Sequence, residues 1–173
     1  SLAVSMLVAR GFEVAAISGK VQQADWLRSI GATAVIDRHA FMRAGPALIS
    51  DPPFAAGLDN VGGPMRDRLL ASTRPHGMVA VAGMIETDMQ TTVLPFVLRA
   101  VDVLGVNVSR QLAMRERRRL WSRMATDLKP KHLTSIAHPI AFERLDEAMD
   151  SFFEGTTVGR VVVEVGAEAQ KVA

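Results

Sequence analysis

The sequence predicts an α/β fold built around a parallel β-sheet. Short apolar segments of strand length alternate with segments in which apolar residues recur at helical spacing, and this alternation is typical of βαβ units. Glycine or proline separates many of these segments, which places turns between them. Apolar residues make up 49% and charged residues 22% of the 173 residues, proportions that are typical of a globular domain.

The first part of the chain reads as helix, strand, helix, strand. Residues 2–9 are apolar on nearly every side and end at Arg10 and Gly11, a cation and a glycine of the kind that close helices. We therefore expect this helix to pack on a sheet. A strand is predicted at 13–18, a helix at 22–31 and a strand at 33–37, and both strands are expected to be buried on both faces.

The middle of the chain continues the alternation after a loop that contains Pro52 and Pro53. A later proline, Pro64, opens a helical segment, and the first turn is where a helix tolerates proline. We predict, in chain order, a strand at 55–61, a helix at 64–73, a turn at 74–77, a strand at 78–83, a short helix around Pro95 and a strand at 101–106.

The last part of the chain begins with a predicted amphipathic helix at 115–128. Its apolar side chains, Leu120, Trp121, Met124 and Leu128, recur at the spacing of a core-facing stripe. A strand at 135–140, a helix at 144–155 and a strand at 159–165 are predicted to follow.

Composition excludes several classes of site. The absence of cysteine rules out disulfides, thiolate metal ligands and cysteine nucleophiles, and it fits a cytoplasmic protein. The four histidines show no ligand spacing, so we expect no metal site. The net charge of +2 predicts no nucleic-acid partner. The apolar N-terminal run is shorter than the roughly 20 residues that span a bilayer, so we expect no membrane association.

Arginines at 115 and 117–119 form a basic run that fits either a nucleic-acid site or a solvated helix face. Glu116 lies within the run and an amphipathic helix contains it, which favours the solvated face. The sequence has no tyrosine that could donate a proton and no nucleophile elbow, so we assign no catalytic residue.

Ligands of open parallel sheets bind at the carboxyl ends of the strands. The predicted strand 13–18 ends in Ser18, Gly19 and Lys20, where a dinucleotide-binding fold that uses NAD carries an acidic residue for the ribose 2′-hydroxyl. A hydroxyl, an open backbone and a cation instead suit a 2′-phosphate, although a solvent-exposed turn with a surface lysine is the alternative. Arg38 ends the neighbouring strand and either joins the same phosphate or opens a loop. Gly83 ends another strand and could admit a nicotinamide ribose.

Several segments together resemble the medium-chain dehydrogenase/reductase superfamily. They are SGK at 18–20, LRSIGATAVIDR at 27–38, LDNVGG at 58–63, MVAVAGM at 78–84, TTVLPFVLRAVDVLGV at 91–106, MATDLKP at 124–130 and VGRVVVEV at 158–165. Within it, the sequence is most similar to the zinc-independent branch of acrylyl-CoA reductases and quinone-oxidoreductase-like proteins. This resemblance covers nearly the whole chain. It implies NADP as cofactor and hydride transfer to an activated C=C bond of acrylyl-CoA or a similar enoyl or quinone-like acceptor.

The resemblance also implies roles for individual residues. Ser18, Gly19, Lys20 and Arg38 match the family's ligands of the 2′-phosphate, Met84 and Val97 match positions on the nicotinamide side, and Arg160 matches a position near the cofactor. Asn107 and Val108 stand where the family more often has Asp-Ser, so the sequence departs from the pattern there. The family's use of the strand at 101–106 implies a homodimer of the full-length protein.

The resemblance implies two domains. Residues 1–133 correspond to an NADP-binding Rossmann-like domain whose first strand and glycine-rich turn we expect before Ser1. Residues 134–173 correspond to a segment that returns to a GroES-like catalytic domain, which we also expect before Ser1. The chain is then a fragment that is inactive alone and binds NADPH weakly. The alternative is a truncated, non-catalytic Rossmann module that acts in nucleotide binding or dimerisation.

Overall fold

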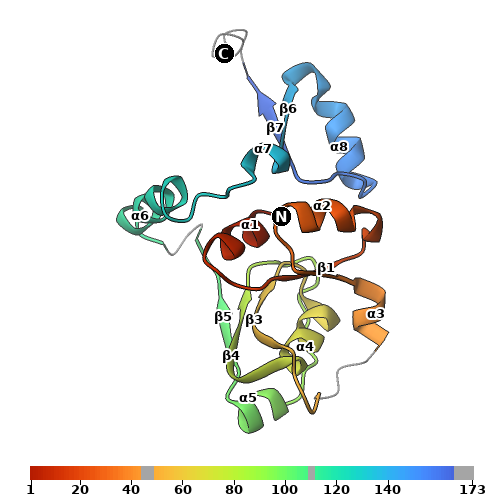
Figure 1. Cartoon of the computed structure of the whole chain (residues 1–173), viewed down its shortest axis with the longest axis vertical. Coiled ribbons are helices and arrows are strands. Elements are labelled where there is room, and N and C mark those ends of the chain that lie inside the picture. The colour runs from red at the N-terminus through yellow and green to blue at the C-terminus, as the bar shows by residue number, and fades with distance from the viewer. Residues whose placement is uncertain (44–48, 109–111, 166–173) are drawn as a thin grey trace. The chain divides into compact units, whose positions relative to one another are not determined.

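The computed structural model describes residues 1–43, 49–108 and 112–165, and it confirms the α/β class (Figure 1). The helices are α1 Leu2–Ala9, α2 Ala24–Ser29, α3 Arg38–Arg43, α4 Gly63–Ala71, α5 Leu94–Arg99, α6 Met114–Ala125, α7 Leu133–Ile136 and α8 Leu145–Phe153, with 3₁₀ turns at Val21–Gln23 and Phe142–Arg144. The strands are β1 Ala15–Ser18, β2 Ala34–Asp37, β3 Phe54–Asp59, β4 Thr73–Val81, β5 Asp102–Gly105, β6 Ala137–Ala141 and β7 Arg160–Glu164. They form three small sheets with the orders β1-β2, β3-β4-β5 and β6-β7.

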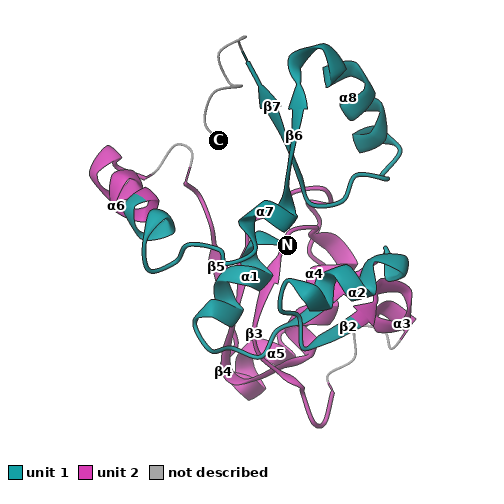
Figure 2. Ribbon diagram, turned by 45° about the horizontal axis from the view of Figure 1, so that its top comes forward, with its two compact units in different colours: residues 1–16, 20–35, 122–173 teal, residues 17–19, 36–121 magenta. Residues whose placement is uncertain are grey.

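The chain divides into two compact units, which Figure 2 colours teal and magenta. Unit 1 contains residues 1–16, 20–35 and 122–173, and unit 2 contains residues 17–19 and 36–121. These divisions fall at other places than the boundary expected after residue 133, and that boundary stays a prediction. In the part of the chain that the structure describes, no helix has the length and apolarity needed to cross a membrane.

Unit 1 has a core of aliphatic side chains from α1, α2 and α7. Val4, Leu27, Ile30, Ala32 and Ile136 are buried in it. Trp26 packs against this cluster and its indole Nε1 donates a hydrogen bond of 3.2 Å to the carbonyl of Ser135. The same unit holds the parallel pair β6–β7, in which Ala137 is in register with Arg160 and Ala141 with Glu164.

Unit 2 is built on the parallel sheet β3-β4-β5. Leu69 and Leu70 of α4 pack against Val79 of β4 and Val101 in the core of this unit. Parallel pairing requires crossover connections, and α4 and α5 supply them between successive strands.

The turn predicted at 74–77 is wrong, because these residues lie inside β4. The pairing register of β3 with β4 shifts between Phe54 and Ala56, which pair with Thr73 and Met78. The intervening residues of β4 therefore bulge, and His76 takes a left-handed backbone conformation with φ of 60°. Proline and glycine in this segment indicated an interruption of the strand pairing. They did not indicate that the same strand continues before and after it.

A buried arginine closes α4. Arg99 of α5 donates hydrogen bonds to the carbonyls of Ala71 at 3.1 Å and Thr73 at 3.2 Å, and also to the carbonyl of Ile49. The carbonyls of a last helical turn have no partner within their own helix. Arg99 thus adds hydrogen bonds to a helix end whose carbonyls also accept from the amide of Ile49 and from the hydroxyls of Ser72 and Thr73.

Two expectations about burial are wrong. Strands β1 and β2 are mostly half-buried rather than buried on both faces. Helix α6 buries none of its side chains, and Leu120 and Trp121 are exposed although their spacing is that of a core-facing stripe.

Candidate functional site

The strand ends of unit 2 line up along one edge of its sheet. Asp59 of β3 pairs in register with Val81 of β4, and Val81 pairs with Gly105 of β5. Because the strands are parallel, their carboxyl ends share this edge, which is where open α/β sheets bind ligands. The predicted residues Gly83, Met84, Asn107 and Val108 all follow directly from these strand ends.

Gly19 and Arg38 lie against each other. Gly19 follows β1, and Arg38 is the first residue of α3 after β2. A Cβ atom at Gly19 would meet Cζ of Arg38 at 3.3 Å, Nη2 at 3.4 Å and Nε at 3.5 Å, so the guanidinium covers the bare backbone of the glycine. Both residues are exposed, which leaves the guanidinium accessible to an anion. Ser18, the half-buried end of β1, precedes this pair.

Lys20 makes a different contact from the one predicted. Its ammonium group donates a hydrogen bond to the carbonyl of Thr157, and both residues belong to unit 1. A carbonyl partner holds the ammonium group without neutralising its charge. The role of Lys20 toward a phosphate stays a prediction.

Gly83 is required by the protein's own backbone. A Cβ atom at this position would overlap the carbonyl carbon and oxygen of Asn60. The amides of Ala82 and Gly83 both donate to the carbonyl of Asp59, at 2.9 and 3.2 Å. The end of β4 therefore crosses closely over the turn after β3, and this packing accounts for the glycine without a cofactor.

The side chain of Asp59 holds the turn after β3 by hydrogen bonds. This role was not predicted from the sequence. The side chain is buried, and Oδ1 accepts hydrogen bonds of 2.9 Å from the amides of Val61 and Gly62. Gly62 has φ of 91°, a conformation that favours glycine. An aspartate whose side chain binds the amides two and three residues later is a common turn signal, and LDNVGG carries it.

Buried charged side chains of α4 form hydrogen bonds with the backbone of the segment after Gly83. Arg66 and Asp67 of α4 are only 6% and 4% exposed. Arg66 donates to the carbonyl of Asp88, and Oδ2 of Asp67 accepts a 3.0 Å hydrogen bond from the amide of Gln90. A third attachment joins the same segment to the turn after β3, where the amide of Glu86 donates to the carbonyl of Val61 at 2.9 Å.

These attachments give Met84 a defined place at the sheet edge. Its side chain is 83% exposed although the backbone on both sides is held. The charged residues that hold it were also missed, because nothing in a helical pattern distinguishes a buried arginine from an exposed one.

The other predicted residues are exposed, and some belong to unit 2 and one to unit 1. Val97 of α5 is 74% exposed, and Asn107 and Val108 are exposed beyond the end of β5 in unit 2. Arg160 begins β7 in unit 1, and its Nη1 donates a 2.9 Å hydrogen bond to the carbonyl of Gly159. The structure therefore brings Gly19 and Arg38 together, and it places Gly83, Met84, Asn107 and Val108 after the carboxyl ends of β4 and β5, whereas Val97 lies on α5 before the start of β5.

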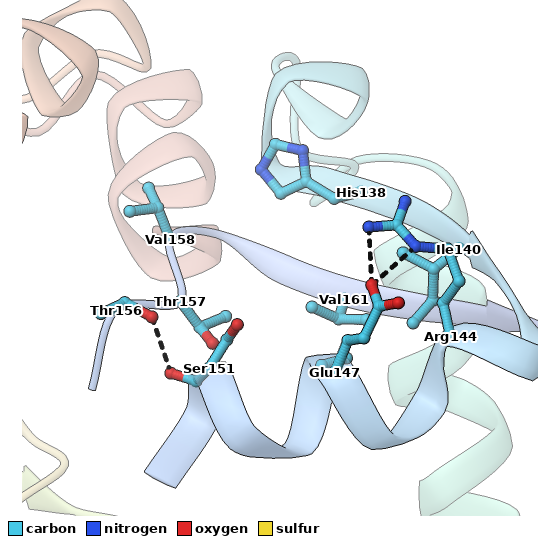
Figure 3. Close-up of a pocket in the computed structure, with 10 residues that line it drawn as sticks. His138, Ile140, Arg144, Glu147, Ser151, Thr156, Thr157, Val158 and Val161 are labelled. Atoms are coloured by element: carbon cyan, nitrogen blue, oxygen red, sulfur yellow. Dashed lines mark hydrogen bonds and ion pairs between the residues drawn. The ribbon is translucent and has the colours of Figure 1, made fainter. Parts of the chain in front are cut away.

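Unit 1 contains an open pocket of about 280 Å³ between α8 and the β6–β7 pair (Figure 3). Arg144 and Glu147 line it as an ion pair of 2.9 Å, and His138 and Ser151 contribute further polar groups. The figure shows Thr156 donating a hydrogen bond to the carbonyl of Ser151 beside it. None of the predicted site residues lines this pocket.

The residues that the structure describes do not fit a zinc site. The chain has no cysteine, and among residues 1–43, 49–108 and 112–165 no three histidine, aspartate or glutamate side chains come together as ligands. Zinc sites of proteins are formed by three or four such side chains. We derive no step that involves a metal from these residues.

Comparisons with known proteins place the chain in a family. Residues 1–126 match the family described as zinc-binding dehydrogenase. The chain is 34% identical over 166 residues to YhfP of Bacillus subtilis, which is named a quinone oxidoreductase, and 33% identical over 168 residues to the acrylyl-CoA reductase AcuI of Ruegeria pomeroyi. These alignments cover 95% and 96% of this chain, but 50% and 51% of the relatives. The chain thus spans about half the length of the curated relatives it matches.

Solved structures agree. The structure of YhfP with NAD bound has a TM-score of 0.87 at 34% identity, and that of Escherichia coli YhdH with bound NADPH has a TM-score of 0.85 at 31% identity. Each comparison covers 95% of this chain and 50% of the other. The chain corresponds to the C-terminal half of these relatives. It belongs to the zinc-binding dehydrogenase family of the medium-chain dehydrogenase/reductase superfamily.

Proposed function

We propose that this chain is the nucleotide-binding part of an NADPH-dependent, zinc-independent oxidoreductase that reduces an activated C=C bond. The observation that carries the proposal is the guanidinium of Arg38 lying over the open backbone of Gly19. An exposed, planar guanidinium at a strand end can donate two parallel hydrogen bonds to oxygens of one phosphate group. We assign the 2′-phosphate of NADP to Ser18, Gly19 and Arg38, with Lys20 as a further cation.

The relatives differ in the cofactor with which they have been solved, so the choice between NAD and NADP has to be decided for this chain. YhfP has been solved with NAD bound, whereas YhdH of Escherichia coli has been solved with NADPH and that of Salmonella enterica with NADP. The two cofactors differ only in the 2′-phosphate, so the group that meets this phosphate decides between them. Arg38 supports NADP for this chain, because a charge-assisted hydrogen bond contributes about 1.5–3 kcal/mol.

The remaining predicted residues support binding and orientation. When bound, NADPH supplies the hydride that adds to the β-carbon of the acceptor, and a proton is added to the α-carbon. The backbone around Gly83 and the segment at Met84, whose backbone is hydrogen-bonded on both sides, shape the sheet edge where the nicotinamide is proposed to lie. Val97 lies on α5 before the start of β5 and is not part of this edge. Asn107 and Val108 flank this edge after β5, and Arg160 is proposed as a further contact of the cofactor.

The acceptor follows from the relatives. The names quinone oxidoreductase and acrylyl-CoA reductase both describe enzymes that act on an electron-poor acceptor, which supports an enoyl-CoA or quinone-like substrate. We place the enzyme in the cytoplasm, and we propose that the full-length protein is a homodimer through β5, whose four residues are all exposed along an edge strand. A non-catalytic nucleotide-binding or dimerisation module is the second candidate, because the chain spans about half of its relatives.

The test is a calorimetric comparison of NADPH and NADH binding by the full-length protein. We expect Arg38→Ala to weaken NADPH binding about 10- to 100-fold with little change for NADH. We also expect Lys20→Asp to shift preference away from NADPH. The matched control is Arg43→Ala, which removes the same charge from the other end of α3.

Equal losses for both cofactors, or unchanged discrimination in both variants, would refute the assignment of the 2′-phosphate. NADPH binding without turnover of any enoyl or quinone acceptor by the full-length protein would favour the non-catalytic module. For the isolated 173-residue chain we expect weak NADPH binding and no turnover.

A further inference from the structure

Helix α6 presents a cationic face that the proposed function leaves unused. The helix contains five arginines and one glutamate between Met114 and Ala125. We call Arg115, Arg118 and Arg119 the cationic face, because residues three and four apart are neighbours on a helix surface. The side chains of Arg115 and Arg119 are 92% and 74% exposed.

The cationic face is not neutralised by the helix itself. Arg115 and Arg119 share one carboxylate, that of Glu116, at 3.3 and 3.7 Å. Arg118 makes no hydrogen bond or ion pair with any residue that the structure describes. Arg123, further along the helix, is already paired with Asp127 at 2.8 Å. The three arginines therefore carry about two uncompensated positive charges on a single turn of helix.

A fourth arginine, on another side of the helix, attaches α6 to the ligand edge of the sheet. Arg117 donates a hydrogen bond to the carbonyl of Val108, which lies just beyond the end of β5. The first turns of α6 are thereby held at the carboxyl end of β5 within unit 2. The cationic face therefore belongs to a helix whose first turns are attached to the edge where the nicotinamide is proposed to lie.

An exposed aromatic ring follows the arginines. Trp121 is 65% exposed and stands three residues after Arg118, so its indole adjoins the cationic face. An indole is a platform on which a nucleotide base stacks, and such stacking contributes about 1–3 kcal/mol per base. Arginines beside an exposed aromatic ring form a surface that suits a phosphorylated nucleoside.

We propose that the cationic face of α6 and Trp121 bind the adenosine 3′-phosphate 5′-diphosphate end of a coenzyme A thioester. The phosphates pair with Arg115, Arg118 and Arg119, and the adenine stacks on Trp121. This inference rests on the proposed function and narrows it, because it makes an acyl-CoA the acceptor rather than a free quinone.

Two other occupants fit the surface less well. A membrane-bound helix needs a continuous apolar side, but Arg117 lies among the apolar side chains of α6, four residues before Trp121. A nucleic-acid duplex needs cations spread over a longer track than these few residues offer. A compact ligand with a base, a diphosphate and a phosphomonoester matches the size of the patch.

The test is calorimetric titration of the full-length protein with coenzyme A, 3′-dephospho-coenzyme A and pantetheine. We expect Arg118→Ala/Arg119→Ala to weaken coenzyme A binding at least tenfold. We expect 3′-dephospho-coenzyme A to bind more weakly than coenzyme A and pantetheine, which has no phosphate, to bind weakest. Arg28→Ala is the matched control, because Arg28 is another exposed helix arginine in an ion pair, with Asp25 at 3.0 Å. Indole fluorescence should change on binding, and this change should be lost in Trp121→Phe and kept in Trp26→Phe.

Equal affinity for coenzyme A in the double variant and the control would overturn the inference, as would equal affinity for pantetheine and coenzyme A. Arginine-dependent binding of duplex DNA or anionic vesicles without binding of coenzyme A would also overturn it. NADPH titration of the same protein separates the two proposals. If the dependence of NADPH binding on Arg38 holds while coenzyme A does not bind, this inference alone fails. If that dependence is absent, the proposed function fails.

Discussion

The Cζ atom of Arg38 lies 3.3 Å from the point where a side chain at Gly19 would begin. This distance is shorter than an ordinary contact between a Cβ atom and a carbon, so the guanidinium can take its position only because residue 19 has no side chain. The two residues come from the ends of adjacent strands, β1 and β2, which pair in one sheet. The position of the Arg38 guanidinium thus depends on the glycine at the end of the neighbouring strand.

Substitution of Gly19 by alanine tests this dependence. The new methyl group would push the guanidinium by a few tenths of an ångström, and an off-rotamer side chain costs about 0.5–1.5 kcal/mol. We expect NADPH affinity to fall about two- to tenfold with NADH affinity unchanged, as measured by calorimetry on the full-length protein. Alanine at Gly105, where nothing lies within 4 Å of the new Cβ atom, is the control. Equal NADPH affinity in Gly19→Ala and the parent protein would show that Arg38 does not need this position.

Gly83 predicts a large effect on stability. Alanine there would overlap the backbone carbonyl of Asn60, and backbone atoms cannot move aside as the end of a flexible side chain can. We expect Gly83→Ala to lower the free energy of unfolding by roughly 1–3 kcal/mol or more in urea denaturation. Gly105→Ala, with open space around its Cβ atom, should change it far less. Equal midpoints for the two variants would mean that β4 does not cross the turn after β3 so closely.

Local signals in the sequence were sufficient for several of the elements, although they did not predict the helices α3 and α7. The apolar run that ends at Arg10 and Gly11 is the helix α1, and the proline at 64 falls in the first turn of α4. The segment 159–165 contains β7. In each case a cap, a proline or an apolar period carries the information within a few residues, and the structure agrees.

Tertiary detail was not local and was missed. The bulge in β4 depends on how Met78 pairs with Ala56 of another strand, which no pattern within 73–81 specifies. Spacing alone placed Trp121 in a core, but a helical stripe does not reveal whether another element covers it.

In the candidate site, too, some contacts could be predicted from the sequence and others could not. The proximity of Gly19 and Arg38 followed from the rule that neighbouring parallel strands end at one edge. The contact of Lys20 with Thr157 did not follow, because it joins residues 137 positions apart. The buried charges of α4 were missed for the same reason, since their partners belong to a later segment.

Asp67 predicts a local effect on the segment that carries Met84. Its Oδ2 atom accepts the hydrogen bond of the Gln90 amide, and the side chain is nearly fully buried. We expect Asp67→Ala to raise the hydrogen-exchange rate of the Gln90 amide at least tenfold, because the amide loses its acceptor. The amide of Ala82, which donates to the carbonyl of Asp59 at 2.9 Å, should keep its rate and serves as the internal control. Parallel acceleration at both amides would indicate general unfolding instead of release of this segment.

The pair of Arg123 and Asp127 predicts how the end of α6 responds to acid. The hydrogen bonds from Arg123 to the Asp127 carboxylate, with Nη2 at 2.8 Å from Oδ2, hold the pKa of Asp127 below its usual value. Since the folded pKa lies below that of the unfolded chain, the pair contributes stability above the unfolded pKa. That contribution is lost as the pH falls through the folded pKa.

A carboxyl titration by NMR should therefore give Asp127 a midpoint below the ordinary value of about 3.9. Arg123→Gln should raise this midpoint toward the ordinary value, because the cation that favours the ionised carboxylate is gone. Arg144→Gln, which removes a cation paired with Glu147 on α8, should leave the midpoint of Asp127 where it was. An unshifted midpoint in the parent protein would show that the pair does not persist in solution, and α6 would then end without it.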